Sequence, residues 1–208
     1  MKAQTKETQA AMTPESALQA LRDGNDRFVN SRQLNRDLLQ QVSETTNGQF
    51  PFATILSCID SRVSSELIFD QGVGDIFSAR VAGNFVNEDI LGSMEFACKL
   101  AGTKVVVVLG HTSCGAVKGA CDDAKLGNLT ALISKLKPAV AAVSEPSDAD
   151  LRNSKNLEFV NNVAQKNVEM TIDNIRKESD VLREMEENGE IAIVGGMYDI
   201  SNGEVAFY

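Results

Sequence analysis

The chain has 208 residues, of which 43% are hydrophobic and 24% charged, and its formal net charge is −9. These values are typical of a water-soluble protein with one domain, and they exclude disordered, fibrous and disulfide-knot classes. No stretch approaches the roughly 18 consecutive apolar residues of a membrane span, so no membrane partner is expected. The negative net charge argues against nucleic acid as a partner, because nucleic acid needs a basic protein face to replace its counterions. The same charge is compatible with binding of a small anion in a local pocket.

The chain contains four cysteines and one histidine. Four thiols are too few for a disulfide scaffold, and all four lie among core-like residues, so metal-binding, catalytic or simply buried thiols are expected. The first fifteen residues lack the apolar stretch of a secretory signal, which predicts a cytoplasmic protein. The alternative is an exported protein whose signal peptide is absent from this chain.

Residues 1–12 are polar, and the pattern predicts a flexible N-terminus. A helix is then predicted with Thr13 as its N-cap, since a proline and an acidic residue follow. A second short helix is expected over residues 36–45. These two helices form an N-terminal arm, residues 13–48, ahead of an α/β core at 49–208. The sequence leaves open whether the arm packs on its own domain or on a second subunit.

From residue 52 onward, strand and helix patterns alternate. Short apolar runs predict five strands, at residues 52–57, 75–79, 104–109, 190–194 and 204–207. Helices are predicted over residues 64–70, 87–100, 115–123, 129–143 and 147–187. Pro138 is expected to interrupt the fourth of these. In the helix predicted over residues 147–187, the candidate core positions are Leu157, Val160, Val163 and Val168. The alternation predicts one α/β domain, residues 13–208.

Residues able to bind a metal follow two of the predicted strands. Cys58 comes directly after the strand at 52–57, and His111 and Cys114 follow the strand at 104–109. Ligand sites in open α/β sheets tend to lie past the carboxyl ends of strands, so the three side chains converge if the two strands are neighbours. Two thiolates and an imidazole suit Zn²⁺, and three protein ligands leave a fourth tetrahedral position open, as in catalytic zinc sites.

An acidic residue, Asp60, and a positively charged residue, Arg62, follow Cys58. Arg62 can keep Asp60 ionised and fix its direction. Each motif alone also fits a buried thiol or a satisfied polar group, but the combination favours a reactive site. The other two thiols are predicted to be a core residue, Cys98, and a spectator, Cys121.

The motifs C-x-D-S-R at 58–62 and H-x-x-C-G at 111–115 resemble the signature of the β-class carbonic anhydrases, zinc enzymes that interconvert CO₂ and bicarbonate. The segments at 78–84 and 195–199 are also similar to stretches of that family, so the resemblance covers most of the chain. It implies a mixed, mainly parallel β-sheet flanked by helices. It also implies a homodimer or homotetramer in which the helical arm, residues 14–46, embraces the partner subunit.

The resemblance further implies roles for individual residues. One Zn²⁺ per chain is expected on Cys58, His111 and Cys114. Asp60 and Arg62 match the catalytic dyad of the family, and Asp60 is a possible fourth ligand in a closed state of the site. The implied substrate-binding residues are Gln49, often acting across the subunit interface, the backbone amide of Gly115, and the pocket walls Phe77, Ala82 and Phe96. Core packing is the alternative role for Phe77 and Phe96.

The implied function is the zinc-dependent, reversible hydration of carbon dioxide to bicarbonate and a proton, by zinc-bound hydroxide that the Asp60–Arg62 dyad orients. Since the single histidine is an implied ligand, proton release is expected to depend on external buffer. Two alternatives are a hydrolase for COS or CS₂ on the same fold, and a zinc-binding or thiol protein without turnover. A structural zinc site, however, uses four protein ligands and needs no such dyad.

Overall fold

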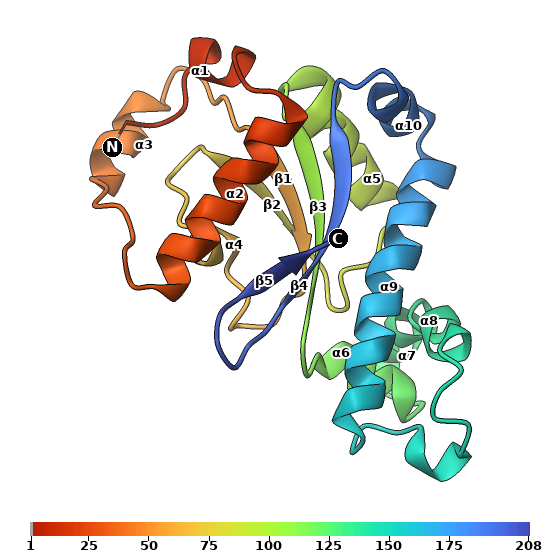
Figure 1. Ribbon diagram of the computed structural model, residues 1–208. Coiled ribbons are helices and arrows are strands. Elements are labelled where there is room, and N and C mark those ends of the chain that lie inside the picture. The colour runs from red at the N-terminus through yellow and green to blue at the C-terminus, as the bar shows by residue number, and fades with distance from the viewer. Residues whose placement is uncertain (1) are drawn as a thin grey trace.

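The sheet occupies the centre of the molecule. In the computed structural model, which describes residues 2–208, its strands lie in the order β2-β1-β3-β4-β5 (Figure 1). The first four strands run parallel, and β5 pairs antiparallel with β4. The strands are β1 (Ala53–Ser57), β2 (Ile76–Arg80), β3 (Val105–His111), β4 (Ala192–Tyr198) and β5 (Val205–Phe207). The predicted mixed, mainly parallel sheet is confirmed, as are its five strands.

The fourth strand is longer than its sequence pattern suggests, because it continues through Gly195 and Gly196. A Cβ atom on Gly195 would lie 2.8 Å from the ring of Tyr208 and 3.1 Å from Val168. Glycine is therefore required here for the close approach of neighbouring side chains, and it hides the strand from a pattern that looks for β-branched residues.

Helices account for most of the remaining chain. Those that precede β3 are α1 (Lys6–Ala10), α2 (Pro14–Val29), α3 (Leu38–Glu44), α4 (Ser65–Ile68), α5 (Glu88–Glu95) and the π-helical turn η1 (Phe96–Leu100). Those that follow β3 are α6 (Gly115–Cys121), α7 (Gly127–Ser134), α8 (Lys137–Ala142), the 3₁₀ turn η2 (Ala149–Leu151), α9 (Leu157–Glu178) and α10 (Asp180–Glu187). No helix within residues 2–208 is long and apolar enough to cross a membrane.

Two long helical predictions are divided in the structure. The expected interruption near Pro138 is confirmed, since α7 ends before it and α8 begins with it at the first turn. The helix expected over residues 147–187 is split at Ser179, whose extended backbone ends α9 and whose side chain caps α10. Leu157 was predicted to be a core residue, which is wrong, because it begins α9 at an exposed position.

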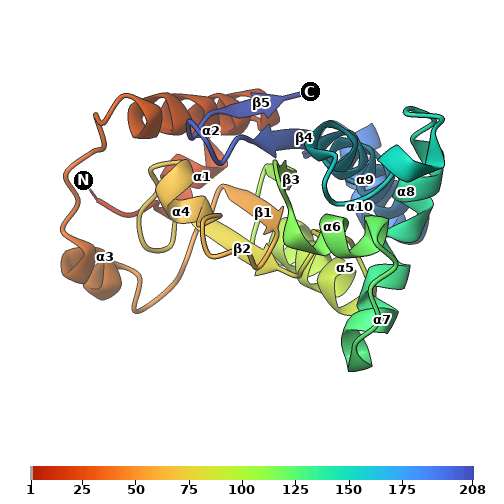
Figure 2. The ribbon, with the colours of Figure 1, turned by 90° about the horizontal axis from the view of Figure 1, so that it is seen from below.

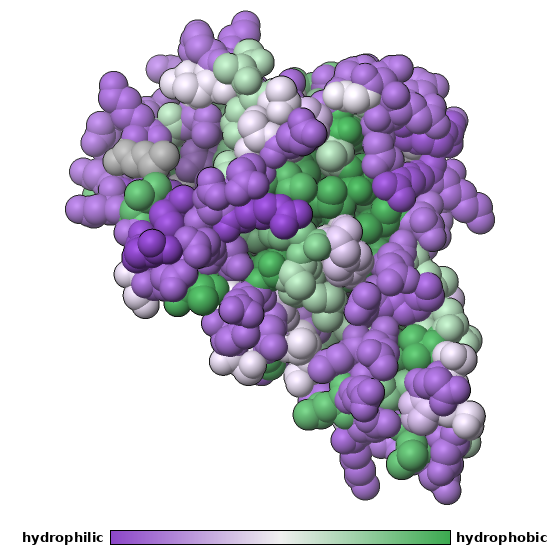
Figure 3. Space-filling model, in the orientation of Figure 1, coloured by the Kyte–Doolittle hydropathy of each residue, from purple (hydrophilic) through white to green (hydrophobic). Residues whose placement is uncertain are grey.

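Alternate residues of the central strands face two separate cores. Ile55, Val105 and Val107 pack toward α2, whereas Leu56 and Val106 pack toward α5, α9 and α10. Figures 1 and 2 show α2 on one side of the sheet and α9 with α10 on the other. Burial on both faces explains the continuous valine run of β3. Between α2 and α9 the surface over β4 and β5 is hydrophobic (Figure 3).

The N-terminal segment differs from its prediction. Met1 lies outside the described residues, but residues 6–10 form α1, with Thr5 as the N-cap. Gln9 is buried and donates hydrogen bonds to the carbonyl oxygens of Pro51 (2.6 Å) and Ala101 (2.8 Å). These two bonds tie a polar segment to the amino end of the sheet, which the sequence pattern of residues 1–12 does not reveal.

The helical arm packs on its own domain through α2, as the burial of Ala17 and Leu21 in the sheet core shows. The third helix is different, since Leu38, Leu39 and Val42 are all exposed. Helix α2 of the arm therefore covers the sheet of its own domain, whereas α3 leaves apolar side chains accessible.

Candidate metal centre

The candidate ligands lie at the carboxyl edge of two adjacent strands. Strands β1 and β3 pair in parallel, with Ser57 opposite Leu109, so the residues that follow them meet at one end of the sheet. Cys58 directly follows β1, His111 ends β3, and Cys114 is the N-cap of α6. The short helices α6, α7 and α8 and the start of α9 pack around this end in one apolar cluster that includes both cysteines. The convergence expected from the two strands is confirmed.

Cys58, His111 and Cys114 form a compact buried cluster. Their potential ligand atoms all lie within 4.8 Å of one another, and the two sulfur atoms are 3.9 Å apart. Two thiolates on a tetrahedral zinc ion, at about 2.3 Å each, would be separated by about 3.8 Å. The spacing of the two sulfurs therefore fits zinc without rearrangement.

The orientation of His111 fits the same ion. The ring is fully buried, and its Nδ1 lies 3.0 Å from the carbonyl oxygen of Thr112, which places the proton on Nδ1. Nε2 is one of three buried side-chain polar atoms without a hydrogen-bond partner in residues 2–208. Leaving a buried acceptor unpaired is costly, so the lone pair on Nε2 is suited to a metal.

The two cysteines are electrostatically coupled. A hydrogen bond from the thiol of Cys114 lowers the pKa of Cys58, and burial opposes this, while the backbone N–H groups of Gly83 and Asp60 lower it further. The pKa of Cys114 is raised, because its thiol shares a proton with Cys58 and because it is buried. A divalent cation takes the place of such a proton, since metal ligation requires both sulfurs as thiolates.

Asp60 and Arg62 form a bidentate ion pair beside the cluster. Arg62 Nε lies 2.9 Å from Asp60 Oδ1, Nη2 lies 2.7 Å from Oδ2, and the backbone N–H of Arg62 also donates to Oδ1. The hydrogen bonds from Arg62 outweigh desolvation and hold the pKa of Asp60 well below its usual range. Asp60 Oδ2 lies 4.0 Å from His111 Nε2. An ionised acceptor thus faces the metal site while both of its oxygens are held by arginine.

Arg80 supports the loop that carries Cys58 and Asp60. Its Nε donates to the carbonyl oxygen of Cys58 (3.0 Å) and its Nη2 to that of Asp60 (2.7 Å). Sequence patterns assign no role to Arg80 beyond its place in the stretch at 78–84. Its function depends on a contact across 20 to 22 residues, which no local pattern contains.

The other predicted site residues fall into two groups. Gly115 opens α6 directly after Cys114, with nothing within 4 Å of the position of a Cβ atom. Ala82 lies in the loop whose next residue, Gly83, donates its N–H to Cys58 Sγ (3.4 Å). These two positions border the cluster.

Gln49, Phe77 and Phe96 lie apart from it. Gln49 is exposed ahead of β1, at the opposite end of that strand from Cys58. Phe77 pairs with Thr54, about 13 Å along β1 from Cys58 at four residues of about 3.3 Å. Its ring meets that of Phe96 edge to face at 6.2 Å, and both line a cavity of about 620 Å³ whose walls include none of the three candidate ligands. One chain therefore does not bring these three residues to its own cluster of Cys58, His111 and Cys114.

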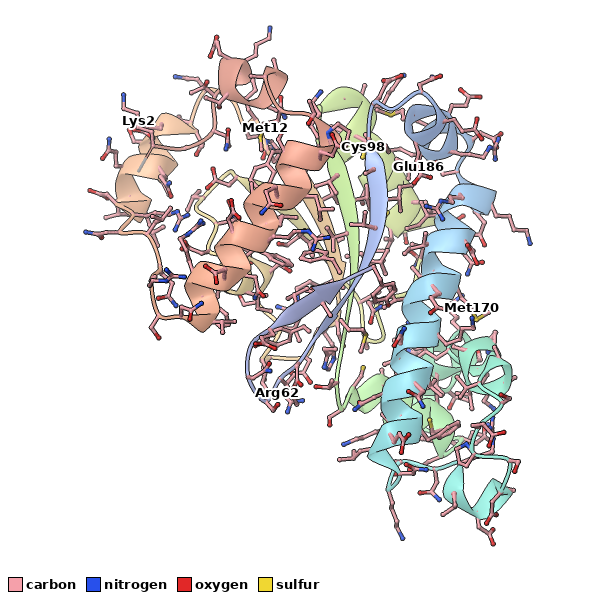
Figure 4. All side chains as sticks on the ribbon, in the orientation of Figure 1. Lys2, Met12, Arg62, Cys98, Met170 and Glu186 are labelled. Atoms are coloured by element: carbon pink, nitrogen blue, oxygen red, sulfur yellow. The ribbon has the colours of Figure 1, made fainter. Side chains whose placement is uncertain are left out.

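The remaining cysteines are not part of the cluster. Cys98 is buried in the core at the end of the sheet opposite Arg62 (Figure 4). Burial raises the pKa of the Cys98 thiol to about 11, and that of the half-buried Cys121 also to about 11. All four thiols of the described chain are free of disulfide bonds.

Comparison with known proteins gives a consistent result. Residues 53–205 match the sequence model of a family described as carbonic anhydrase. The chain is 35% identical over 196 residues to carbonic anhydrase 2 of Mycobacterium tuberculosis, covering 91% of this chain and 90% of that one. It is 33% identical to a carbonic anhydrase of Mycolicibacterium smegmatis, with 92% of each chain covered. Its fold is similar to that of a tetrameric β-carbonic anhydrase from Sordaria macrospora, with a TM-score of 0.68, 25% identity, and coverage of 80% of this chain and 84% of the other.

Proposed function

The chain belongs to the β-class carbonic anhydrase family, enzymes that interconvert CO₂ and bicarbonate, and we propose that it does so at a zinc ion held by Cys58, His111 and Cys114. The observation that carries this proposal is the buried, unpaired Nε2 of His111 beside two sulfurs 3.9 Å apart. With three protein ligands, an ion bound there would have room for a water molecule. When bound in such a site, zinc lowers the pKa of water from about 15.7 to about 7 and so supplies a nucleophile at neutral pH.

Asp60 orients that nucleophile. Its carboxylate accepts a hydrogen bond from the attacking oxygen, which turns the lone pair of that oxygen toward CO₂. Arg62 keeps Asp60 ionised and therefore an acceptor, and its two parallel hydrogen bonds fix the direction of the carboxylate. As long as these bonds persist, Asp60 is not a metal ligand. A closed state with Asp60 as the fourth ligand requires the pair to break.

Substrate and product contact residues from two chains in this proposal. The amide of Gly115 and the wall at Ala82 belong to the same chain as the zinc ligands. Gln49, Phe77 and Phe96 serve the site of a neighbouring subunit, because their own cluster is out of reach. This arrangement requires a homo-oligomer, in line with the exposed apolar side chains of α3 and with the tetrameric relatives from Sordaria macrospora.

Replacement of Cys58 by Ala tests the proposed metal site. We expect loss of zinc and of CO₂ hydration together, as one of three ligands is gone. Cys121→Ala is the matched control, since this half-buried thiol lies outside the cluster, and both zinc content and activity should persist. Full zinc binding and activity in Cys58→Ala would contradict the proposal.

A further inference from the structure

Helix α9 carries asparagines that contact both loops of the metal centre. Its buried face is mostly apolar, but it includes Asn167, which is 4% exposed. A buried amide is costly unless it is hydrogen-bonded, so its partner is informative. Asn167 Nδ2 donates to the carbonyl oxygen of Gly83 (2.8 Å).

Gly83 belongs to a tight turn that follows β2. The N–H of Val81 donates to the carbonyl oxygen of Ser57 and so continues the sheet. The N–H of Asn84 closes the turn by donating to the carbonyl oxygen of Val81 (2.9 Å). Gly83 occupies the third position with φ +82°, as a type II turn requires. Its N–H then points out of the turn and donates to Cys58 Sγ. By holding the carbonyl of Gly83, Asn167 fixes the turn that presents this donor to a metal ligand.

The second loop is held in the same way, six residues earlier on α9. Asn161 Oδ1 accepts the N–H of Ser113 (2.9 Å), which lies between His111 and Cys114. Ser113 has φ +56°, a left-handed conformation that serine rarely adopts. The bond to Asn161 stabilises that conformation and thereby the spacing of His111 and Cys114.

We propose that Asn161 and Asn167 are positioning residues of the metal centre: from one helix, each fixes one of the two ligand-bearing loops. This inference rests on the proposed zinc site. A helix holds residues six apart at a fixed separation of about 9 Å along its axis. Because both loops are bonded to this helix, they hold their ligands at the separation that zinc needs even before the ion binds. Groups of this kind behind metal ligands typically contribute 10–100-fold to metal affinity.

The two asparagines act with opposite hydrogen-bonding roles, which makes the proposal sharply testable. Asn161 accepts from an N–H group, so Asn161→Asp keeps the interaction, whereas Asn161→Leu removes it. Asn167 donates to a carbonyl, so Asn167→Asp and Asn167→Leu both remove it. We expect the Zn²⁺ affinity of the full-length protein, measured by competition with a chelator, to fall 10–100-fold in Asn161→Leu, Asn167→Leu and Asn167→Asp. Asn161→Asp should stay within about threefold of wild type.

A spectroscopic signature accompanies the affinity. In protein loaded with Co²⁺, the thiolate-to-cobalt charge-transfer band reports the geometry of the sulfur ligands. We expect this band to change in the three weakened variants and to be retained in Asn161→Asp. Asn161 is only partly buried, so its two variants decide the proposal by themselves if those of Asn167 do not fold.

Two control variants separate positioning from general stability. Asn25 is also buried and donates to two backbone carbonyls, those of Ile68 and Gly203, but it contacts neither ligand loop. Asn25→Leu should lower the free energy of unfolding and leave zinc affinity unchanged. Asn162→Leu, at the exposed neighbour of Asn161, should change neither quantity.

Unchanged zinc affinity in Asn161→Leu, or an equal loss in Asn161→Asp and Asn161→Leu, would overturn the inference. So would a loss in Asn25→Leu as large as that in the Asn167 variants. If wild type binds zinc and Cys58→Ala does not, these outcomes count against the positioning role alone. If wild type itself binds no zinc, the proposed function fails first.

Discussion

Arg62 holds both carboxylate oxygens of Asp60, and it does so while Asp60 Oδ2 lies only 4.0 Å from His111 Nε2. The carboxylate therefore stands next to the candidate metal site without being free to enter it. This relationship determines what Asp60 can do in the proposed reaction: it can accept a hydrogen bond there, but it is not a proton donor at neutral pH.

Asp60→Asn tests this role. An amide of the same shape can present its NH₂ group where an acceptor is needed, so we expect CO₂ hydration to fall by about 10²- to 10⁴-fold, the usual range for a group that handles a proton in the transition state. Zinc content should stay at the wild-type level, because none of the three ligands is altered. Stopped-flow hydration and metal analysis on the same sample provide the measurement.

Arg62→Lys is the companion variant. It keeps a positive charge but loses the two parallel hydrogen bonds, so an intermediate loss of activity is expected. Activity of Asp60→Asn equal to that of wild type would rule out the proposed role of the pair.

The proton product should leave through external buffer. The chain has a single histidine, His111, which is one of the three proposed zinc ligands, so no histidine is left to carry the proton to solvent. We expect turnover at saturating CO₂ to rise with buffer concentration and then to level off. The measurement is stopped-flow hydration over a buffer series at constant pH and ionic strength. Turnover independent of buffer would show that another group carries the proton.

A subunit-mixing experiment tests the shared active site. Consider a heterodimer of one Asp60→Asn chain and one Gln49→Ala chain. If Gln49 acts on the site of the partner, the site of the Gln49→Ala chain contains its own native Asp60 and the native Gln49 of the other chain. If Gln49 acts instead on the site of its own chain, neither site of the heterodimer contains both native residues. We therefore expect the mixed, differently tagged dimer to hydrate CO₂ at about half the rate per dimer of wild type, while both parental homodimers are impaired. A mixed dimer no more active than its parents would place Gln49 outside the partner's site.

A purely structural prediction concerns Asp70. Its carboxylate is 4% exposed and is bound by Arg27 (2.5 Å to Nε) and by Arg36, while Arg36 also donates to its carbonyl oxygen. Burial raises the pKa of Asp70, but hydrogen bonds from Arg27, the N–H of Leu34 and Arg36 outweigh it, so the net pKa lies below the usual value. Asp70→Asn leaves the two arginines without their anion, and we expect a loss of about 3 kcal/mol in the free energy of unfolding at pH 7.

The sign of the pH dependence follows from the lowered pKa. The stabilisation is fully present above the unfolded-state pKa of about 4 and is lost as the pH falls through the lower folded-state value. The difference between wild type and Asp70→Asn in denaturant unfolding should therefore shrink below about pH 4. Asp26→Asn, in an exposed pair with Arg32, is the control and should cost less than about 1 kcal/mol. A constant difference down to pH 2 would contradict this account.

The strands and the convergence of Cys58, His111 and Cys114 were predictable for the same physical reason. Runs such as Val105 to Leu109 are buried on both faces of a parallel sheet, and the residues that follow neighbouring parallel strands must meet at one edge. The positions of Cys58, His111 and Cys114 along the chain therefore sufficed to predict that their side chains converge. The ion pair of Asp60 and Arg62 is equally local, since only one residue separates its members.

The supporting residues were not predictable, because their partners are distant in sequence. Arg80 reaches back 22 residues to Cys58, and Asn167 contacts Gly83 across 84 residues. Gln9 is similar, since it stabilises a segment whose composition indicates no element. In each case a polar side chain is fixed by backbone groups that tertiary packing brings near.

Zinc dependence can be tested by adding zinc stepwise to metal-free protein and measuring CO₂ hydration by stopped flow after each addition. We expect activity to rise in proportion to added Zn²⁺ and to stop rising at one equivalent per chain, and we expect no such rise in Cys58→Ala. Hydration at full rate without zinc, or one bound zinc per chain with no hydration between pH 6 and pH 9, would show that the chain does not hydrate CO₂ at a zinc ion held by Cys58, His111 and Cys114.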